Sequence, residues 1–536
     1  MDTIVLRSQD FGIKPNTQED AAPALRKLIT AAANYNSTVI QLEAGDYLLD
    51  QDTDRIMLEF WENHDITIRG SVDKNNEPCT CLKIKLPLEN DTAAKGFFAV
   101  RRSKNITLEN LVFDYTHRPS SVGRIVEADV ERNRVVVDVL EGQSHFDHMK
   151  CYSANCWDLR TGSLKHTHPL TIGVDKKTFA HEWTWIPGGE GRRYEIWDMN
   201  FAHLVQPDDG MSWHFNVIGV GEDKPHVIIA SNSENLVLRN LRIRSCIGMT
   251  GIFVCNHHIT MQQIRVEADG TSLAVSPRDF AWMRCNSGKL LIEDCYVKGV
   301  RWDPFNIWSG MYPITNISKD RKQITFEMLH KYQTFCKTGQ TICFWTDDGA
   351  IDIPFNNIEL VEGGFVLSFE QPIDNQIQIG AYLTPSWVIF DEVLMRNTTV
   401  EDNCGTGLLF QNQNLIVEHC SFNNNSYDAI ALGPISGREG SFARNVVIRD
   451  TDFVTNTWIN KAAIHDGSIS ICNGFGPLLD KPYNQNISVI GNRFRDCDVA
   501  ISIRNAQNIQ ISDNEMKGIG KEIAIGCPKD QPGDDY

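Results

Sequence analysis

The sequence lacks the apolar and basic segments that attach proteins to membranes or to polyanions. No run of roughly 18 or more apolar residues occurs, which excludes a transmembrane helix. The net charge of −18 does not suit the phosphate contacts that sequence-independent nucleic-acid binding needs. The N-terminus, MDTIVLRSQDFG, also lacks the basic and apolar regions of a signal peptide. We therefore expect no transmembrane segment and no nucleic-acid partner.

Motifs for metals and cofactors are missing as well. The chain has fifteen cysteines, an odd number, without a CxxC pair or a Cys/His zinc spacing. No phosphate loop, dinucleotide fingerprint or Ser/His/Asp order is present. Cys295, Cys420 and Cys497 occupy equivalent places in strand-like segments, which favours free buried thiols. We expect no cofactor and no metal.

What the sequence does have is a degenerate repeat of the form Asn–apolar–x–apolar–x–(Asn/Asp)–x–x–apolar. It begins at Asn105, Asn235, His258, Lys289, Asn414, Asn445, Asn486 and Asn508. The shortest intervals are 23 residues, from Asn235 to His258, and 22 residues, from Asn486 to Asn508. Intervals of 31 residues fit one coil plus a loop.

Each repeat reads as two short strands joined at a polar corner. Such strands bury one face only by stacking on the next coil. Asn suits the corner because it tolerates the left-handed conformation and its amide can bond to the Asn of the next coil. A β-sandwich has no such Asn at one-coil spacing. The sequence therefore predicts an all-β, right-handed parallel β-helix.

The N-terminus is expected to cap this solenoid with a helix. Thr17 is placed to N-cap a helix over 18–34, with acidic Glu19 and Asp20 in its first turn. Apolar residues follow at helical spacing: Ala22, Leu25, Leu28, Ile29 and Ala32.

Two stretches break the repeat and alternate like antiparallel strands, so we expect two inserted β modules of barrel-like form. The predicted division is 1–113 for the cap and first coils, 114–230 for the first module, 231–310 for central coils with the candidate site, 311–390 for the second module, and 391–536 for the last coils.

Acidic residues gather between the central repeats at Asp269, Asp279 and Asp303. Asp279 and Asp303 are 24 residues apart, close to one coil, so they could project from neighbouring coils on one face. Glycoside hydrolysis needs such a carboxyl pair, one to protonate the leaving oxygen and one to activate water or attack. Aromatic residues surround them: Trp282, Trp302, Phe305 and Trp308. Because Asp is also common in turns, the spacing alone leaves a structural role open.

Two other polar pairs have simpler interpretations. Asp347 and Asp348 fit a turn or a calcium-binding loop within the second module. His257 and His258 precede a strand, where a corner role is expected in place of a metal site.

Longer segments resemble glycoside hydrolase family 110, the β-helical α-1,3-galactosidases. They are DFGIKPNTQEDAAPALRKLI, RSKNITLENLVFDY, HVIIASNSENLVLRNLRI, GMTGIFVCNHHITMQQIRV and GTGLLFQNQNLIVEHCSFNNNSYDAIAL. The resemblance implies an inverting, exo-acting glycosidase without a required metal. It places Asp279 on one family carboxylate, Asp303 on the second member of an Asp–Asp pair, and Asn306 on a following Asn. Trp302 stands where the first member of that pair would be, and Trp282 and Trp308 stand where the family has histidines.

These departures leave two main hypotheses. The first is a hydrolase of a terminal α-linked, galactoside-like sugar, with Asp279 and Asp303 as acid and base in either order. Its substrate contacts would be Asn306, Trp282, Trp302, Trp308, Arg278 and Arg284. The second is a glycan-binding protein that has lost catalysis at Trp302. A polysaccharide lyase or epimerase ranks last because such enzymes need calcium or basic residues to neutralise a uronate. In either main case the partner is an oligosaccharide or glycan, a homodimer is possible, and the resemblance implies a periplasmic or extracellular location.

Overall fold

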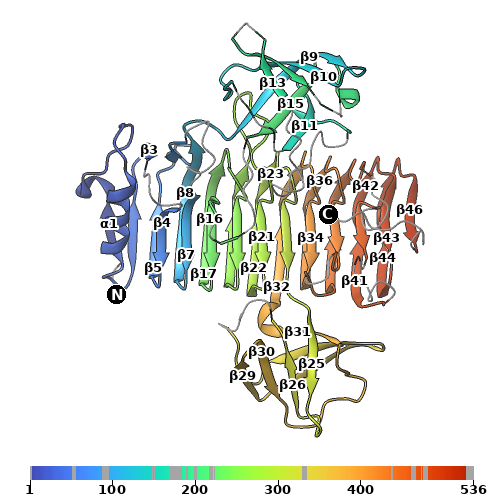
Figure 1. Cartoon of the computed structure of the whole chain (residues 1–536). Helices are drawn as coiled ribbons and strands as arrows, with labels where there is room; N and C mark the ends of the chain where they lie inside the picture. The colour runs from blue at the N-terminus through green and yellow to red at the C-terminus, as the bar shows by residue number, and fades with distance from the viewer. Residues whose placement is uncertain are drawn as a thin grey trace.

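The computed structural model describes residues 3–526, except 51–55, 87–95, 148, 150, 152, 168–183, 189–190, 198, 200–201, 216–220, 223, 329–334, 436–438, 460–465, 473 and 475–480. The described chain winds into a parallel β-helix whose coils stack in order from the N-terminus to the C-terminus (Figure 1). The predicted fold class is confirmed.

Parallel strands form the walls of the solenoid in two sheets. Within the described residues, sheet B has eleven strands: β4 (Ile56–Trp61), β7 (Gly96–Arg101), β16 (Ile228–Ser231), β18 (Gly251–Val254), β21 (Ala281–Arg284), β24 (Phe305–Trp308), β34 (Leu408–Gln411), β37 (Ile430–Leu432), β40 (Ile469–Ile471), β43 (Val499–Ile503) and β46 (Lys521–Ile525).

In the part of the chain that the structure describes, sheet A has 21 strands. It turns a corner of the coil, because the long strands β8 and β17 belong to both of its rows. Its first row contains β1 (Ile4–Arg7), β2 (Thr38–Gln41), β5 (His64–Arg69), β8 (Lys104–Tyr115), β17 (Glu234–Ile243), β19 (His257–Gln262), β22 (Ser287–Glu293), β32 (Phe390–Arg396), β35 (Gln413–Glu418), β38 (Arg444–Arg449), β41 (Asn484–Ile490) and β44 (Ala506–Ser512). The second row adds β3 (Gly45–Leu49), β6 (Thr80–Ile84), β20 (Arg265–Val266), β23 (Tyr296–Lys298), β33 (Thr399–Glu401), β36 (Ser421–Asn423), β39 (Asp452–Val454), β42 (Arg493–Arg495) and β45 (Glu515–Lys517).

The repeat marks the corners, as predicted. Asn235 has a φ of 56°, and Asn105, Asn445 and Asn508 are also left-handed. Their amides form a ladder along the solenoid: Asn235 Nδ2 donates to Asn105 Oδ1 at 2.8 Å, and Asn445 Nδ2 donates to Asn414 Oδ1 at 2.9 Å. Each corner thus satisfies its polar group on the neighbouring coil.

The core of the solenoid is a continuous apolar column, and in the C-terminal coils like residues stack on one another. Phe422, Phe453 and Phe494 are fully buried, and successive rings stack with centroids 5.6 Å and 4.8 Å apart. Every coil adds its apolar strand face to this column, so the buried core grows with the number of coils.

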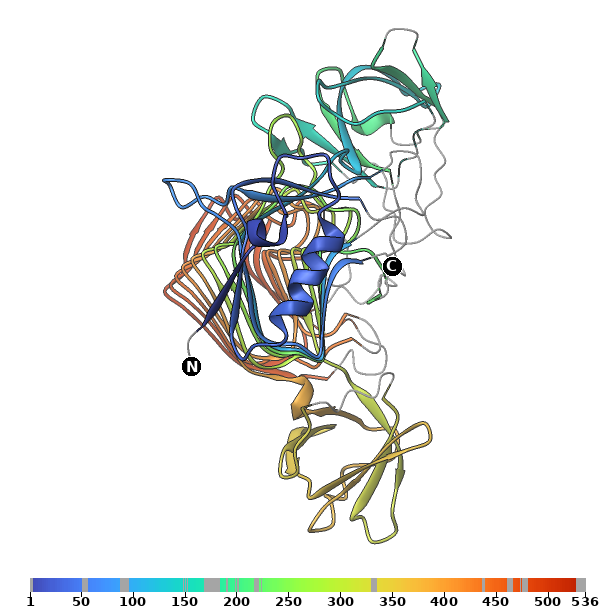
Figure 2. The same cartoon turned by 90° about the vertical axis from the view of Figure 1, so that its left-hand side faces the viewer.

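The capping helix begins later than predicted. The helix α1 spans Ala22–Ala32, and Thr17 lies outside it, where its hydroxyl donates to Lys14 O at 3.4 Å. The N-cap residue is Ala21, which has no capping side chain, and Oδ1 of Asp20 before it accepts from Ala22 N at 3.0 Å. Pro23 then fits the first turn, where its missing N–H costs nothing. The predicted apolar face is buried, and α1 lies across the end of the solenoid (Figure 2).

Two antiparallel modules project on opposite sides of the solenoid (Figure 1). The first contains β9 (Ser120–Asp129), β10 (Arg134–Val139), β11 (Ser153–Asp158), β12 (Ser163–Leu164), β13 (Thr184–Pro187), β14 (Arg193–Trp197) and β15 (Gly210–His214). The second contains β25 (Tyr312–Ile317), β26 (Gln323–Phe326), β27 (Thr341–Thr346), β28 (Gly349–Pro354), β29 (Asn357–Val361), β30 (Gly364–Ser368) and β31 (Tyr382–Pro385).

The two modules share one strand order. The first runs β12-β11-β15-β9-β10-β14-β13 and the second β28-β27-β31-β25-β26-β30-β29, so the fourth strand of each is the first along the chain. Short 3-10 helices accompany the fold at η1 (Ser8–Phe11), η3 (Ala202–Leu204) and η4 (Ser386–Val388).

Three smaller expectations are also met. All the cysteines in the described ranges are free, and most are buried. Asp347 and Asp348 form the two-residue turn between β27 and β28, and Asp347 pairs with Lys481 at 2.5 Å. His258 occupies a left-handed corner, where its Nδ1 accepts from Lys289 N at 2.9 Å. None of the helices described is long and apolar enough to cross a membrane.

Candidate active site

The outer face of sheet B lies between the two modules. The first module returns the chain shortly before β16, and the second departs just after β24. Along β24, Phe305 and Ile307 point into the solenoid core, while Asn306 and Trp308 alternate to the outer face. The outward side chains of the central coils pack in one apolar cluster with the second module.

Asp279 and Asp303 stand at equivalent places on neighbouring coils. Ala281 of β21 pairs with Phe305 of β24, and each aspartate lies two residues before its strand. The backbone continues the pairing, because Phe280 N donates to Asp303 O at 3.3 Å. The one-coil spacing predicted from the sequence is confirmed.

The carboxyl of Asp279 is almost wholly buried, at 1% exposure. Its Oδ2 accepts a long hydrogen bond of 3.5 Å from Asn306 Nδ2, while Oδ1 has no partner among the residues described. Burial raises the pKa of Asp279 to about 7, and the negative charge of Glu439 adds to that rise, whereas Arg278 and Asn306 lower it. Asp279 is therefore suited to hold a proton near neutral pH.

Asp303 has a different environment. It is 8% exposed, and its Oδ1 accepts from Thr406 N at 2.8 Å. Thr406 lies two residues before β34 on the next coil. A backbone donor of this kind stabilises the ionised carboxylate. The two aspartates thus differ in burial and in hydrogen bonding.

Trp282 and Trp308 contact each other edge to face, with ring centroids 5.4 Å apart. Both belong to an apolar cluster that continues into the second module, and they are only 9% and 6% exposed. Arg284 lies over the Trp308 ring at 4.8 Å. Within the described residues, the Trp308 Nε1 donor and the Asn306 Oδ1 acceptor have no hydrogen-bond partner. Both atoms are buried, so their unused hydrogen-bonding capacity lies beneath the surface of this face.

Trp302 and the nearby arginines complete the predicted set. Arg301, 2% exposed, lies over the Trp302 ring at 5.4 Å and donates from Nη1 to Cys404 O at 3.2 Å. Arg278 is 8% exposed and acts electrostatically on Asp279. Trp302 precedes Asp303 directly in the chain, and the guanidinium of Arg301 covers one face of its ring.

Sequence reasoning missed two polar residues of this face. Gln411 is fully buried at the end of β34, directly in register with Trp308. Glu439 comes from the segment after β37, and burial raises its pKa. Neither residue lies at a repeat position, so no spacing in the sequence indicated them.

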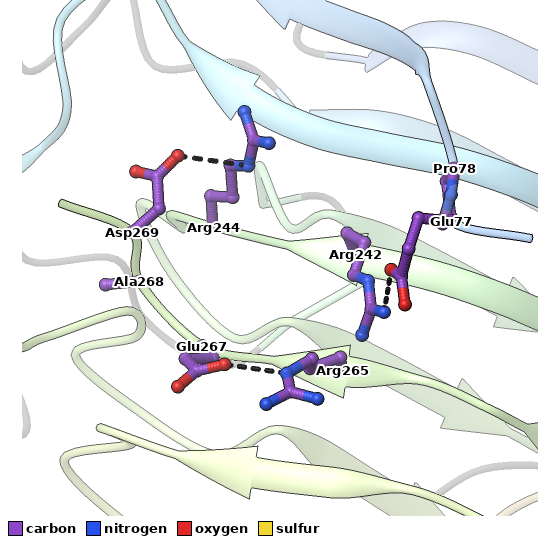
Figure 3. Close-up of a pocket in the computed structure, with 8 residues that line it drawn as sticks. All are labelled: Glu77, Pro78, Arg242, Arg244, Arg265, Glu267, Ala268 and Asp269. Atoms are coloured by element: carbon purple, nitrogen blue, oxygen red, sulfur yellow. Dashed lines mark hydrogen bonds and ion pairs between the residues drawn. The ribbon is translucent and has the colours of Figure 1, made fainter. Parts of the chain in front are cut away.

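Asp269, the third carboxylate singled out from the sequence, lies elsewhere. It lines a hollow of about 370 Å³ on sheet A, away from sheet B (Figure 3). There Arg244 pairs with Asp269 at 3.3 Å and Arg265 with Glu267 at 2.7 Å, while Arg242 pairs with Glu77. Because these arginines are neutralised within the hollow, the pairs have a structural role. No group of three or more His, Cys, Asp or Glu side chains in the described ranges is arranged to hold a metal ion.

A family model described as a right handed beta helix region matches residues 378–527. The chain is 21% identical to α-1,3-galactosidase B of Akkermansia muciniphila, covering 97% of this chain and 67% of that protein. It is 21% identical to α-1,3-galactosidase A of Shewanella woodyi, covering 91% and 81%. A third match, α-1,3-galactosidase B of Bacteroides thetaiotaomicron, is also 21% identical and covers 96% and 86%. The chain is a divergent relative of the α-1,3-galactosidases.

These matches confirm the resemblance to glycoside hydrolase family 110, and they extend over most of this chain. Among solved structures, the A-module of mannuronan C-5 epimerase AlgE6 from Azotobacter vinelandii superposes with a TM-score of 0.42 at 10% identity. That match covers 97% of this chain and 96% of the other, and a similarity this low has no bearing on activity.

Proposed function

We propose that this protein is a glycoside hydrolase that removes a terminal α-linked, galactoside-like sugar from a glycan. The observation that carries the proposal is Asp279, a buried carboxyl with a pKa of about 7 and one oxygen without a partner among the described residues. A general acid needs this combination, because it must hold its proton at working pH and aim it at an approaching oxygen.

In the proposed reaction, Asp279 is the acid and Asp303 is the base. The Asp279 carboxyl gives its proton to the glycosidic oxygen as the bond from that oxygen to the anomeric carbon breaks. Asp303 takes a proton from the water that attacks the opposite face of the same carbon. The products are the free sugar with inverted configuration and the alcohol of the remaining glycan, and solvent restores the two protonation states.

Substrate contacts would come from the outer face of sheet B. Asn306 Oδ1 and Trp308 Nε1 offer an acceptor and a donor that lack partners within the described residues, and sugar hydroxyls can satisfy both. Trp282, Trp302, Arg278 and Arg284 border these groups. An exported location, periplasmic or extracellular, would suit an enzyme acting on glycans.

A second candidate is a glycan-binding protein without catalysis, and one observation favours it. Trp302 occupies the position where the family resemblance expects a carboxylate. The burial of Trp282 and Trp308 argues against this candidate, because a sugar-stacking platform needs exposed ring faces.

Hydrolysis of a panel of aryl α- and β-glycosides and blood-group-type oligosaccharides separates the two candidates. We expect release of one α-linked sugar by the wild type and none by Asp279→Asn or Asp303→Asn. Nuclear magnetic resonance of the first-formed anomer would report inversion. Binding without release, retained in Asp279→Asn and weakened in Trp308→Ala, would replace the hydrolase with the binding protein.

A further inference from the structure

Sheet A carries two adjoining hollows on the outer side of its second row, away from the candidate active site on sheet B. The first, of about 370 Å³, is the one shown in Figure 3, and the second has about 340 Å³. Both are lined by Glu77, Arg242 and Arg265. Each hollow has the size at which proteins bind small ligands, roughly 300–1,000 Å³.

Three of the lining residues form a row in register on successive coils. Arg242 of β17 pairs with Arg265 of β20, which pairs with Tyr296 of β23. The guanidinium of Arg265 lies over the Tyr296 ring at 4.4 Å, and the Tyr296 hydroxyl donates to Glu401 Oε1 at 2.6 Å. Because two arginines in register repel each other, the stacking of the coils gains nothing from this pair.

The hairpin over residues 71–79 forms one wall and lines both hollows. Val72 and Pro78 make its antiparallel bridge. Its tip is fixed to a corner of the solenoid, where Asn240 Nδ2 donates to Asn76 O at 3.1 Å. The wall and the row of strands are thus held in place before any ligand arrives, which lowers the entropic cost of binding.

The charges around the hollows are balanced. Three arginines of the first hollow pair with three carboxylates, as Figure 3 shows, and the second hollow has two of each sign. Arg265 and Glu267 keep exposed fractions of 43% and 34%, so the pairing leaves donors and acceptors open to solvent. An anion would meet as many carboxylates as guanidiniums, whereas a sugar hydroxyl can donate to the one and accept from the other.

We propose that these hollows form a second glycan-binding site, which takes a neutral oligosaccharide. Guanidinium groups donate to its hydroxyls and carboxylates accept from them, in positions that the ion pairs fix. Side-chain amides of the second hollow add further donors and acceptors: Asn75, Asn76, Asn240 and Gln263. The inference goes beyond the proposed function, because no residue of sheet B and no chemical step enters it.

Hydrogen–deuterium exchange of the full chain locates this binding. Asp303→Asn is used to prevent turnover, with the neutral blood-group-type oligosaccharides as one set of probes and oligogalacturonates as anionic probes. A neutral probe should slow exchange over residues 71–79 and 265–269 in a saturable way, and the anionic probes should not. Protection confined to sheet B, protection by the anionic probes alone, or no protection at millimolar concentration would each overturn the proposal.

Two matched variants test the lining residues. Arg265→Ala should raise the dissociation constant, read from the protection of residues 71–79, by at least about tenfold, or about 1.4 kcal/mol. Arg493 forms a similar pair with Asp452 at 2.6 Å further along sheet A, so Arg493→Ala should leave the constant nearly unchanged. Equal effects of the two variants would refute the assignment.

These measurements also separate the inference from the proposed function. Saturable protection of the hollows in a wild-type protein that releases no sugar would support the second site while the hydrolase proposal fails. Release of a sugar without any protection of the hollows would support the hydrolase and overturn the second site.

Discussion

Asn306 Nδ2 on β24 lies 3.5 Å from Asp279 Oδ2 on the preceding coil. This contact joins two residues 27 positions apart through the stacking of two coils. It favours the ionised carboxylate, whereas burial and Glu439 favour the protonated one, and the outcome is a pKa of about 7. The chemistry of the site depends on this balance.

Replacing Asp279 by Asn should remove activity while leaving the fold intact. A positioned general acid typically supplies a rate factor of about 10² to 10⁴, so kcat should fall by that amount. The amide occupies nearly the same volume, and it removes a carboxyl that is costly to ionise in this position. Steady-state kinetics and a melting curve check both parts; retained activity would remove Asp279 from the mechanism.

Removing Asn306 should shift the pH profile of activity to higher pH. Without the amide that favours the charged form, the pKa of Asp279 should rise further. The alkaline limb of kcat/KM in Asn306→Ala should then move to higher pH, by less than about one unit because the bond is long. Exposed Asn316 on β25 provides a matched control as Asn316→Ala. A shift to lower pH would contradict the assignment.

Stability should fall as pH rises through neutrality, and Asp279 should account for part of the fall. Its pKa is about 7 in the folded protein against an ordinary value of 3.8, so the folded state binds its proton more tightly than the unfolded state. The resulting stabilisation is complete below about pH 4 and is lost as pH passes about 7, up to about 4 kcal/mol in all. Denaturant unfolding of wild type and Asp279→Asn between these limits isolates the contribution. Parallel pH profiles for the two proteins would exclude it.

The corner asparagines should stabilise the solenoid mainly through backbone conformation. Asn445 has a φ of 57°, accepts from Asn486 Nδ2 at 3.2 Å and is exposed. Asn445→Ala should lower the free energy of unfolding by about 1–2 kcal/mol, because Ala pays the full cost of the left-handed region. Asn445→Gly should recover most of this loss, since Gly adopts the conformation freely. Equal losses in both variants would assign the effect to the amide ladder.

Much of the fold could be predicted because its signals are local and recur once per coil. Each left-handed corner selects Asn, and each strand alternates in burial, so register is visible in the spacing from Asn235 to His258. The predicted start of α1 was wrong because the Thr17 hydroxyl bonds back to Lys14 O and the helix begins only at Ala22. The carboxylate of Asp20 bonds to Ala22 N, and Pro23 fits the first turn that follows.

Only those residues of the candidate site that come from two successive coils could be predicted from the sequence. The interval of 24 residues correctly indicated that Asp279 and Asp303 occupy equivalent positions on neighbouring coils. Trp282 and Trp308, from the same two coils, contact each other. Gln411 and Glu439 join from coils that lie beyond the second module, more than 100 residues away along the chain. Their place depends on β34 stacking on β24 across that insertion, and no local pattern records it.

The first and last strands of each module pair directly with one another, β9 with β15 and β25 with β31. The chain therefore leaves the solenoid and returns at nearly the same point. As a result, β17 stacks on β8 and β32 on β22 as though nothing lay between them. Each module is thus a self-contained unit whose two ends adjoin, and both modules have the same strand order. Either module can therefore be exchanged for another with adjoining ends while the pairing of β17 with β8 and of β32 with β22 is kept.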